Sequence, residues 1–441
     1  MNAYRIDLLP ENDRTNGWAA HLPPRTPRSH LIGDVRADWL VIGAGWAGLA
    51  AARRLAGNRP SDRVVIIDAA AVADGASGRN SGFAIDLPHT SGGAADENKG
   101  ALGHMRLSRT GIAHLKEQID THGIDCDWRE KGKFHAAVTE RGSAEYLEPF
   151  AEALARLGEP FEWVEAPALR EKLGTDHFTR AVHTPGGALM NPVALVRGLA
   201  DSLPGNVDLH EHTPALSVEY ANGTRVVTPE GTIRAPQCIL AVNGFAPGFG
   251  AFERRVLPML AYASLSRPLI DAEQAAWGVA EDWGMTPANS FVGATMRYTS
   301  DRRLLIREKV GYRPSMRVTE AERRGAAERH KRLFDARFPE LRDVELAHTW
   351  TGFVALTRNF APGFGRVRGG VHAACLQNGV GVTKGTVAGI LAADLACDRD
   401  NPLLADMEAL GTPASLPPAP VLGLGVRARL AWELWRWRAE A

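Results

Sequence analysis

Three glycines near the start of the chain have the spacing that brings a polypeptide backbone against a phosphate group. Gly43, Gly45 and Gly48 form G-x-G-x-x-G between the apolar run DWLVI and the helix-like segment WAGLAAARRLAG. The first glycine permits a tight turn, the second lets the backbone approach a pyrophosphate, and the third lets the helix pack on the strand. The helix N-terminus adds free N–H groups and the positive end of a dipole. The motif predicts a dinucleotide site, and its alternative is a purely structural glycine turn.

The segment that follows supports a nucleotide site. RVVIIDA reads as a second buried strand, and the two strands with the helix make a βαβ unit of about thirty residues. Asp68 stands at the end of the second strand, where a carboxylate can bind the hydroxyls of an adenosine ribose. The pattern by itself leaves NAD and FAD open.

A turn-rich loop, ASGRNSGF at residues 76–83, carries polar side chains suited to a charged ligand. Ser77, Asn80 and Ser81 are turn-forming residues, yet Arg79 lies among them. An arginine supplies several fixed donors, and serine and asparagine supply short polar contacts. The alternative is a solvated turn.

The segments WLVIGAGWAGLAAARRLA and IIDAAAVADGASGRNSGF resemble the start of the D-amino-acid-oxidase-like superfamily of FAD-dependent oxidoreductases. Within it, the chain is most similar to the gamma-glutamylputrescine oxidoreductase group, whose loop resembles GASGRN. The resemblance implies bound FAD, with this loop reaching from the pyrophosphate toward the isoalloxazine. It also implies a mixed α/β fold, in which a Rossmann-like FAD-binding domain is interleaved with a mixed-sheet substrate domain, as in glycine oxidase and sarcosine oxidase.

Three later segments extend the resemblance. The return of the chain to the FAD domain is resembled by LHEHTPALSVEY followed by TIRAPQCILAVNGF. The family's W-x-G…T-x-D-x-x-P-x-x-G segment is resembled by HTWTGFVALTRNFAPGFG. The family's last glycine-rich loop and helix are resembled by QNGVGVTKGTVAGILAA. Asn359 replaces the acidic residue of the second segment, so any role of that carboxylate is lost. In the third, backbone N–H groups of Gly379, Val380 and Gly381, with Thr383, are expected at the flavin O2/N3 edge, where a helix N-terminus would stabilise the anionic reduced flavin.

The motif and the resemblance together assign a set of residues to the cofactor. The expected cofactor-binding residues are Gly43, Ala44, Gly45, Trp46, Ala47, Gly48, Asp68, Ala69, Gly75, Ala76, Ser77, Arg79, Asn80, Ser81, Ala215, Ala241, Asn243, Gly244, Gly352, Asn378, Gly379, Val380, Gly381 and Thr383. Some relatives attach FAD through a cysteine that aligns near Gly352, but no cysteine lies close by. We therefore expect non-covalent FAD, with Cys375 a small buried residue.

The resemblance implies a hydride transfer from the carbon next to an amine to flavin N5, giving an imine that water hydrolyses. Loops facing the flavin then offer candidates for substrate contact and catalysis: His89, Arg297, Tyr298, Trp350 and Lys384. Arg297 would pair with a substrate carboxylate or phosphonate, and Lys384 would assist reaction with oxygen. Three of them have plainer alternatives: His89 as a structural loop histidine, Arg297 as a solvated surface arginine and Trp350 as a core tryptophan.

Composition excludes several other classes. The chain has 441 residues, with 51 basic and 51 acidic side chains, so no net charge draws it onto nucleic acid. Four scattered cysteines form no CxxC pair, and His210 and His212 share a strand face with too few further ligands for a metal. The N-terminus lacks a secretory h-region, and no stretch reaches the roughly 18 apolar residues of a membrane helix. We expect a cytoplasmic protein with no metal and no transmembrane segment.

The expected domains are discontinuous. Residues 1–36 form a leader packed on the surface; residues 37–100, 180–254 and 346–441 form the FAD-binding domain; residues 101–179 and 255–345 form the substrate-binding domain. The tail VRARLAWELWRWRAEA is an amphipathic helix with Val426, Leu430, Leu434 and Trp437 on one side. It either caps the fold or contacts a membrane surface or a partner.

The function expected from these features is oxidation of a small amine or amino acid, with oxygen or an electron carrier as acceptor. The alternatives are an amine dehydrogenase acting on an aminophosphonate or a gamma-glutamyl-polyamine, and a non-catalytic FAD-binding protein. An NAD(P)-dependent oxidoreductase would explain the βαβ unit, but neither the GASGRN loop nor the late glycine loop.

Overall fold

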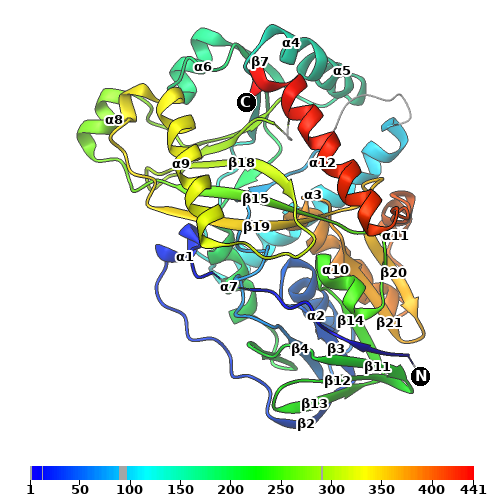
Figure 1. Ribbon diagram of the computed structural model, residues 1–441. Coiled ribbons are helices and arrows are strands. Elements are labelled where there is room, and N and C mark those ends of the chain that lie inside the picture. The colour runs from blue at the N-terminus through cyan, green and yellow to red at the C-terminus, as the bar shows by residue number, and fades with distance from the viewer. Residues whose placement is uncertain (1, 12, 89–96, 290–291) are drawn as a thin grey trace.

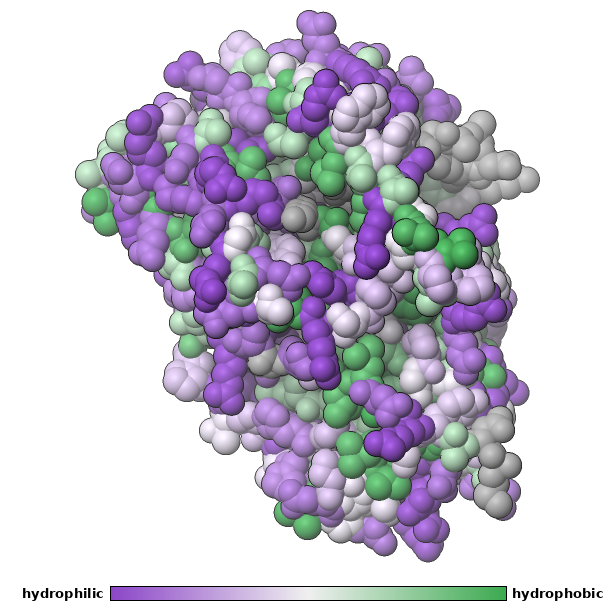
Figure 2. Space-filling view, in the orientation of Figure 1, coloured by the Kyte–Doolittle hydropathy of each residue, from purple (hydrophilic) through white to green (hydrophobic). Residues whose placement is uncertain are grey.

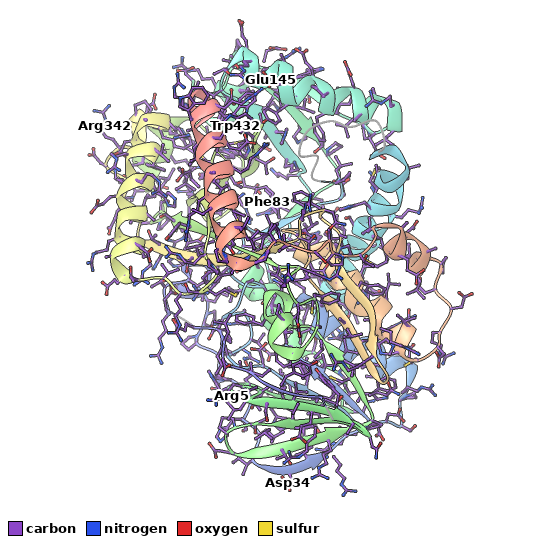
Figure 3. All side chains as sticks on the ribbon, turned by 45° about the vertical axis from the view of Figure 1, so that its right-hand side comes forward. Arg5, Asp34, Phe83, Glu145, Arg342 and Trp432 are labelled. Atoms are coloured by element: carbon purple, nitrogen blue, oxygen red, sulfur yellow. The ribbon has the colours of Figure 1, made fainter. Side chains whose placement is uncertain are left out.

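The computed structural model describes residues 2–11, 13–88, 97–289 and 292–441. Two sheet layers dominate it, with a smaller sheet at one end (Figure 1). In Figure 3, Arg5 and Asp34 mark the small sheet, whereas Glu145 and Trp432 mark the opposite end of the molecule. Phe83 lies between these two ends, where the two large sheets meet.

The six-stranded sheet contains the βαβ unit that the sequence predicts. Its spatial order is β10 (Val207–His210), β4 (Val64–Ile67), β3 (Trp39–Ile42), β14 (Gln237–Leu240), β21 (Val371–Cys375) and β20 (Gly363–Arg368). The first five strands are parallel and β20 is antiparallel. Every residue of β3 and β4 is buried, as expected for continuous apolar runs in a sheet covered on both faces.

Helices cover this sheet. They are α2 (Trp46–Asn58), α3 (Glu97–His122), α7 (Pro192–Asp201), α10 (Thr386–Ala396) and α11 (Leu403–Ala409). Helices α2 and α10 pack so closely that a Cβ atom at Gly389 would lie 2.0 Å from the Ala47 carbonyl oxygen. The side chain of Asn191 caps the start of α7 by accepting hydrogen bonds from the N–H groups of Val193 and Ala194, and Pro192 stands in the first turn.

The eight-stranded sheet forms the second layer. Its spatial order is β19 (His348–Leu356), β15 (Leu257–Leu265), β18 (Leu304–Tyr312), β17 (Thr295–Tyr298), β16 (Trp283–Pro287), β6 (Lys133–Ala137), β8 (Arg180–Thr184) and β7 (Glu162–Glu165). Around it lie α4 (Glu140–Gly142), the π-helix η1 (Ser143–Leu147), α5 (Glu148–Leu157), α6 (Ala166–Leu173), α8 (Asp271–Trp277), α9 (Glu320–Arg337) and the 3-10 turn η3 (Pro339–Leu341).

The N-terminal segment is part of the fold rather than a leader on its surface. The five-stranded sheet has the order β1 (Asn2–Arg5), β11 (Ser217–Ala221), β12 (Gly223–Val227), β13 (Gly231–Ala235) and β2 (Gly33–Arg36), so the first 36 residues contribute both edge strands. Helix α1 (Gly17–Ala20) buries Trp18 against Trp350. The short strands β5 (Phe83–Ala84) and β9 (Ala188–Leu189) form a separate pair.

The observed sheets divide the chain differently from the expected boundaries. Strands β8 and β19 belong to the eight-stranded sheet, although residues 180–254 and 346–441 are expected in the FAD-binding domain. Helix α3 packs on α10 and α11, beside the six-stranded sheet. Long-range strand pairing decides these memberships, and local sequence pattern does not report it.

The chain ends in α12 (Ala419–Arg436) and the 3-10 turn η5 (Arg438–Glu440), which lie over the eight-stranded sheet (Figure 1). Trp437 is buried, and the Glu440 carboxylate accepts hydrogen bonds from the N–H groups of Val138 and Thr139. Leu434, expected on the packed side, is 41% exposed. Figure 2 shows hydrophobic side chains on the surface around α11 and the first turns of α12. Within the described residues, no helix combines the length and apolar character needed to cross a membrane.

Candidate cofactor and substrate site

One large cavity, of about 490 Å³, lies between the two main sheets. Its first half is lined by the segments that follow β3, β4, β14 and β21 at the carboxyl ends of these parallel strands. This is the edge where open α/β sheets bind ligands. Its second half is lined by residues of the eight-stranded sheet, so the cavity joins the two layers.

The early glycine turn has the geometry that its motif predicts. Gly43 has φ +104°, and a Cβ there would lie 2.6 Å from the Ala241 carbonyl oxygen. A Cβ at Gly48 would lie 1.7 Å from the Gly43 carbonyl oxygen. Side chains at either position would push the helix away from the turn, and the backbone would lose its close approach to a ligand.

Asp68 holds this turn together. Its carboxylate accepts hydrogen bonds from the Ala44 N–H at 2.7 Å and the Ala70 N–H at 2.9 Å. Burial raises its pKa to about 6, although these two hydrogen bonds act in the opposite direction. The carboxylate lines the cavity, so the predicted ribose contact stays open to it.

The 76–83 loop lines the cavity, but its arginine acts mainly on the protein. The Arg79 guanidinium donates to the Asp74 carbonyl at 2.7 Å, the Thr351 carbonyl at 3.1 Å and the Asp13 carboxylate at 2.9 Å. The side-chain oxygen of Asn80 accepts a hydrogen bond from the Gly82 N–H at 2.9 Å, which closes the turn. Arg79 therefore shapes the loop, and it also lines the cavity, so its predicted contact with the cofactor stays a prediction.

The late glycine loop reaches the same cavity. The Asn378 side chain accepts from the Thr357 N–H at 2.7 Å and donates to the Phe360 carbonyl at 2.9 Å, which fixes the loop against the end of β19. Gly379, at φ +82°, and Gly381 follow. The π-helix η4 (Gly381–Gly385) then leads into α10, so a helix N-terminus faces the cavity.

Two orphaned polar atoms show that this half of the cavity suits a polar ligand. The side-chain oxygens of Asn243 and Gln377 are buried without a hydrogen-bond partner among the described residues, and both side chains line the cavity. Buried acceptors without partners are costly, so a donor-bearing ligand is expected to satisfy them. The glycine turn and these acceptors together fit the dinucleotide and ring of FAD.

Most of the expected cofactor residues line this cavity, whereas Gly48, Val380 and Thr383 do not. Gly48 permits the helix approach described above. The Thr383 hydroxyl donates to the Ile85 carbonyl at 3.0 Å and is fully buried. The loop that contains Thr383 reaches the cavity through Gly381 and Val382.

The expected catalytic residues are placed differently from the predictions. His89 lies outside the described residues. Arg297, Tyr298, Trp350 and Lys384 are all at most 2% exposed, and none lines the cavity.

Three of the four have contacts within the protein, and the fourth, Lys384, is buried. The Arg297 guanidinium donates to the carbonyls of Gly82 and Met190, which removes it from pairing with a substrate anion. Trp350 donates to the Arg79 carbonyl at 3.1 Å, and Tyr298 packs against Trp277. Burial lowers the pKa of Lys384 to about 8.

Sequence reasoning missed a polar row at the second half of the cavity. Lys133 and His135 alternate on β6, so both point to one face. The Lys133 ammonium donates to the Thr286 hydroxyl at 3.1 Å, and the His135 Nδ1 atom lies 3.0 Å from the same oxygen. All three line the cavity. The alternation in KGKFH was the available signal, but no motif marks it.

Arg307 continues this row on β18. It pairs in register with Thr295, and its guanidinium donates to the Thr295 hydroxyl at 3.0 Å. Both residues line the cavity, and no carboxylate forms a salt bridge with Lys133 or Arg307 in the described parts of the chain. Burial lowers the pKa of both cations, that of Lys133 to about 8.

The fold and this cavity define a flavin-dependent oxidoreductase, and comparison with known proteins agrees. Residues 38–395 match the model of the family described as FAD dependent oxidoreductase, the DAO family, and the chain belongs to this family. The expected family, cofactor and architecture are thereby confirmed.

The chain is similar to two curated bacterial proteins and to one solved structure. The chain is 28% identical to gamma-glutamylputrescine oxidoreductase of Escherichia coli K12 over 421 residues, covering 92% of each chain. It is 26% identical to the probable oxidoreductase OrdL of Haemophilus influenzae over 405 residues, covering 89% of this chain and 88% of the relative. Glycine oxidase from Geobacillus kaustophilus shares the fold with a TM-score of 0.69 at 21% identity, covering 83% of this chain and 96% of that structure.

The close approach at Gly48 predicts a sharp mutational contrast within α2. Gly48→Ala should lower the free energy of unfolding by about 1–3 kcal/mol, because the new methyl group overpacks against the Gly43 carbonyl. It should also lower the flavin content of the purified protein. Gly57→Ala is the matched control, since a Cβ there meets nothing within 4 Å. Urea unfolding and flavin absorbance measure both effects, and equal behaviour of the two variants would contradict the assigned role.

The cavity also predicts how FAD is attached. No cysteine is among the residues that line the cavity, and Cys375 is buried in β21 with its thiol toward the Leu240 carbonyl. Acid precipitation should leave all the flavin in the supernatant. Flavin absorbance that stays with the precipitated protein would show a covalent bond and reject this prediction.

Proposed function

We propose that this protein oxidises a small amine that carries an acidic group, by hydride transfer from the carbon next to nitrogen to bound FAD. The observation that carries the proposal is the continuity of the cavity. One wall is made by the two glycine loops of the FAD-binding layer, and the other presents two cations, Lys133 and Arg307, that form no salt bridge with a carboxylate among the described residues.

Bound FAD supplies a two-electron acceptor for the substrate carbon–hydrogen bond. The chain supplies position and environment. The loops around Gly43, Arg79 and Gly379 hold the cofactor, while η4 directs a helix N-terminus toward it. Apolar side chains such as Phe83, which lines the cavity, exclude water from the space beside the cofactor. The imine product then requires only water to become a carbonyl compound and an amine.

The polar row supports an acid-bearing substrate. His135 and Arg307 stand on strands separated by two others, so their backbones lie about 14 Å apart. Their long side chains and that of Lys133 point into the space between. Buried cations without carboxylate partners are stabilised by an anion. The names of gamma-glutamylputrescine oxidoreductase and glycine oxidase, both for substrates that combine amine and carboxylate, agree with this proposal.

The electron acceptor separates two versions of the proposal. An oxidase passes the electrons to oxygen and forms hydrogen peroxide, whereas a dehydrogenase passes them to a carrier. Proteins of both names share this fold, such as iminodiacetate oxidase and L-proline dehydrogenase. A peroxide assay beside an artificial-dye assay distinguishes the two versions.

The proposed reaction predicts a direct optical result. Anaerobic addition of an acid-bearing amine, drawn from a panel of amino acids, N-substituted amino acids, gamma-glutamyl amines and aminophosphonates, should bleach the flavin absorbance. The matching amines without the acid should bleach it far more slowly. A flavin that no member of the panel bleaches would favour the non-catalytic alternative.

The substrate contact predicts a selective loss. Lys133→Met should raise KM for the acid-bearing amine about 10- to 100-fold, because one charge-assisted hydrogen bond is lost. KM for an amine that lacks the acidic group should stay nearly unchanged. Lys131→Met is the matched control, since Lys131 lies two residues earlier and pairs with Glu281 and Asp282 away from the cavity. Equal loss on both substrates would point to damage of the fold instead.

The lowered pKa of Lys133 predicts a pH dependence. Burial lowers this pKa to about 8, so the ammonium is charged below pH 8 and loses its proton as the pH rises through 8. The ratio of kcat/KM for the acid-bearing amine to that for an uncharged amine should therefore fall above pH 8. The two amines are chosen to have the same pKa, so that the ratio cancels the titration of the substrate amine. In Lys133→Met this fall should disappear, and its persistence would assign it to another group.

A further inference from the structure

The N-terminal segment between β1 and α1 crosses the molecule along the cofactor cavity. In Figure 1 it is the dark-blue chain that runs from the N-terminal strand to α1. Its residues Ile6, Leu8, Leu9, Pro10 and Glu11 line the same cavity as the glycine turn. The match to the family model begins only at residue 38, so this lining comes from outside the matched region.

The segment is fixed at its first end by the small sheet. Strand β1 pairs with β11, and the Ile6 N–H continues this ladder by donating to the Leu216 carbonyl at 2.9 Å. Ile6 is buried in the same apolar cluster as Ala215 and Phe249, which also line the cavity. Leu9 packs against this cluster and is only partly covered.

Its other end is fixed to the 76–83 loop. The Asn16 amide donates to the Gly78 carbonyl at 2.8 Å, and the Trp18 indole donates to the Asn80 carbonyl at 2.9 Å. A Cβ at Gly17 would lie 2.8 Å from the Trp350 ring, so this end fits tightly. The segment therefore begins beside one part of the cofactor cavity and ends on the loop that forms another.

Charge contacts hold the middle of the segment. The Asp13 carboxylate accepts from Arg79 at 2.9 Å and lies 3.4 Å from Arg323 on α9, so it joins the cofactor loop to the second layer. Burial alone would raise the pKa of Asp13, but hydrogen bonds from Thr15 and Arg79 hold it below its ordinary value. Glu11 pairs with Arg317 at 3.0 Å, where both side chains are more than half exposed.

We propose that residues 6–11 form a strap over bound FAD, and that the strap opens to admit or release the cofactor. As far as the structure describes this segment, its middle has few backbone hydrogen bonds and is held by half-buried apolar side chains and ion pairs. Such a segment opens more readily than the strands and helices on either side. FAD completes the contacts of Leu8, Leu9 and Pro10, and the strap in turn slows the departure of FAD.

The strap predicts faster release of FAD when its apolar face is removed. The double variant Leu8→Ser/Leu9→Ser should release FAD about 10- to 100-fold faster, because two half-buried side chains lose their apolar contact. The measurement is the rise of flavin fluorescence with time after large dilution of the holoprotein into flavin-free buffer. Ile32→Ser is the matched control, since Ile32 lies in the same N-terminal region, is 69% exposed and does not line the cavity. Unchanged release in a folded double variant would overturn the proposal.

A second variant keeps the test valid if the double variant fails to fold. Asp13→Asn leaves the apolar face intact and removes the charge that joins Arg79 to Arg323. It should speed FAD release several-fold, and added salt should speed release in the wild-type protein but have less effect in the variant. If the release rate depended equally on salt in the wild-type protein and in Asp13→Asn, the proposed role of the Asp13 charge in holding the strap would be contradicted.

Limited trypsin digestion tests the opening itself. Arg5 and Arg14 flank the strap and both are exposed. Apoprotein should be cut after Arg14 faster than holoprotein, with the cut after the exposed Arg36 as the internal reference. Equal cleavage of the two forms after Arg14, relative to this reference, would show that the strap does not respond to FAD.

Discussion

The structure depends on one arginine, Arg79, whose donors join its own loop to two distant parts of the chain. The Arg79 side chain joins its own loop at Asp74, strand β19 at Thr351 and the N-terminal segment at Asp13. Its carbonyl oxygen accepts the Trp350 indole N–H, so the main chain is tied to β19 as well. Because a guanidinium presents its donors in a fixed planar arrangement, these contacts set the position of the loop relative to both sheets.

This arrangement explains why the cavity is shared by the two layers. The parallel strands of the six-stranded sheet end at one edge and direct their loops toward β19 and β15. A Cβ at Gly352 would lie 3.2 Å from the Arg79 carbonyl oxygen, so β19 passes directly along the cofactor loop. Arg297 completes the junction by donating to the carbonyls of Gly82, just before β5, and of Met190, just after β9. Arg297 and Trp350, two of the residues expected to contact the substrate, thus hold the two halves in place.

The second layer lines one wall of the cavity with polar side chains. Four neighbouring strands, β6, β16, β17 and β18, each contribute one or two polar side chains to the same face. Asn359, which replaces an acidic residue of the family pattern, donates to the Thr412 carbonyl and accepts from the Ala414 N–H. It therefore fixes the approach to the C-terminal helix, and the lost carboxylate is replaced by a structural contact.

The sequence alone determined the features that depend on near neighbours in the chain. The turn at Gly43, the buried strands, the cap of α7 and the late glycine loop follow from spacing and local backbone requirements, and the resemblance added FAD and the interleaved fold. Tertiary structure alone decided which strands share a sheet. It also placed Arg297 and Trp350 behind the cavity wall, and it brought Lys133, Arg307 and the N-terminal segment to face the cavity. These depend on pairings between residues more than a hundred positions apart, such as His135 with Thr286. No local pattern records such pairings, because a strand's alternation fixes which side chains share a face but not what that face meets.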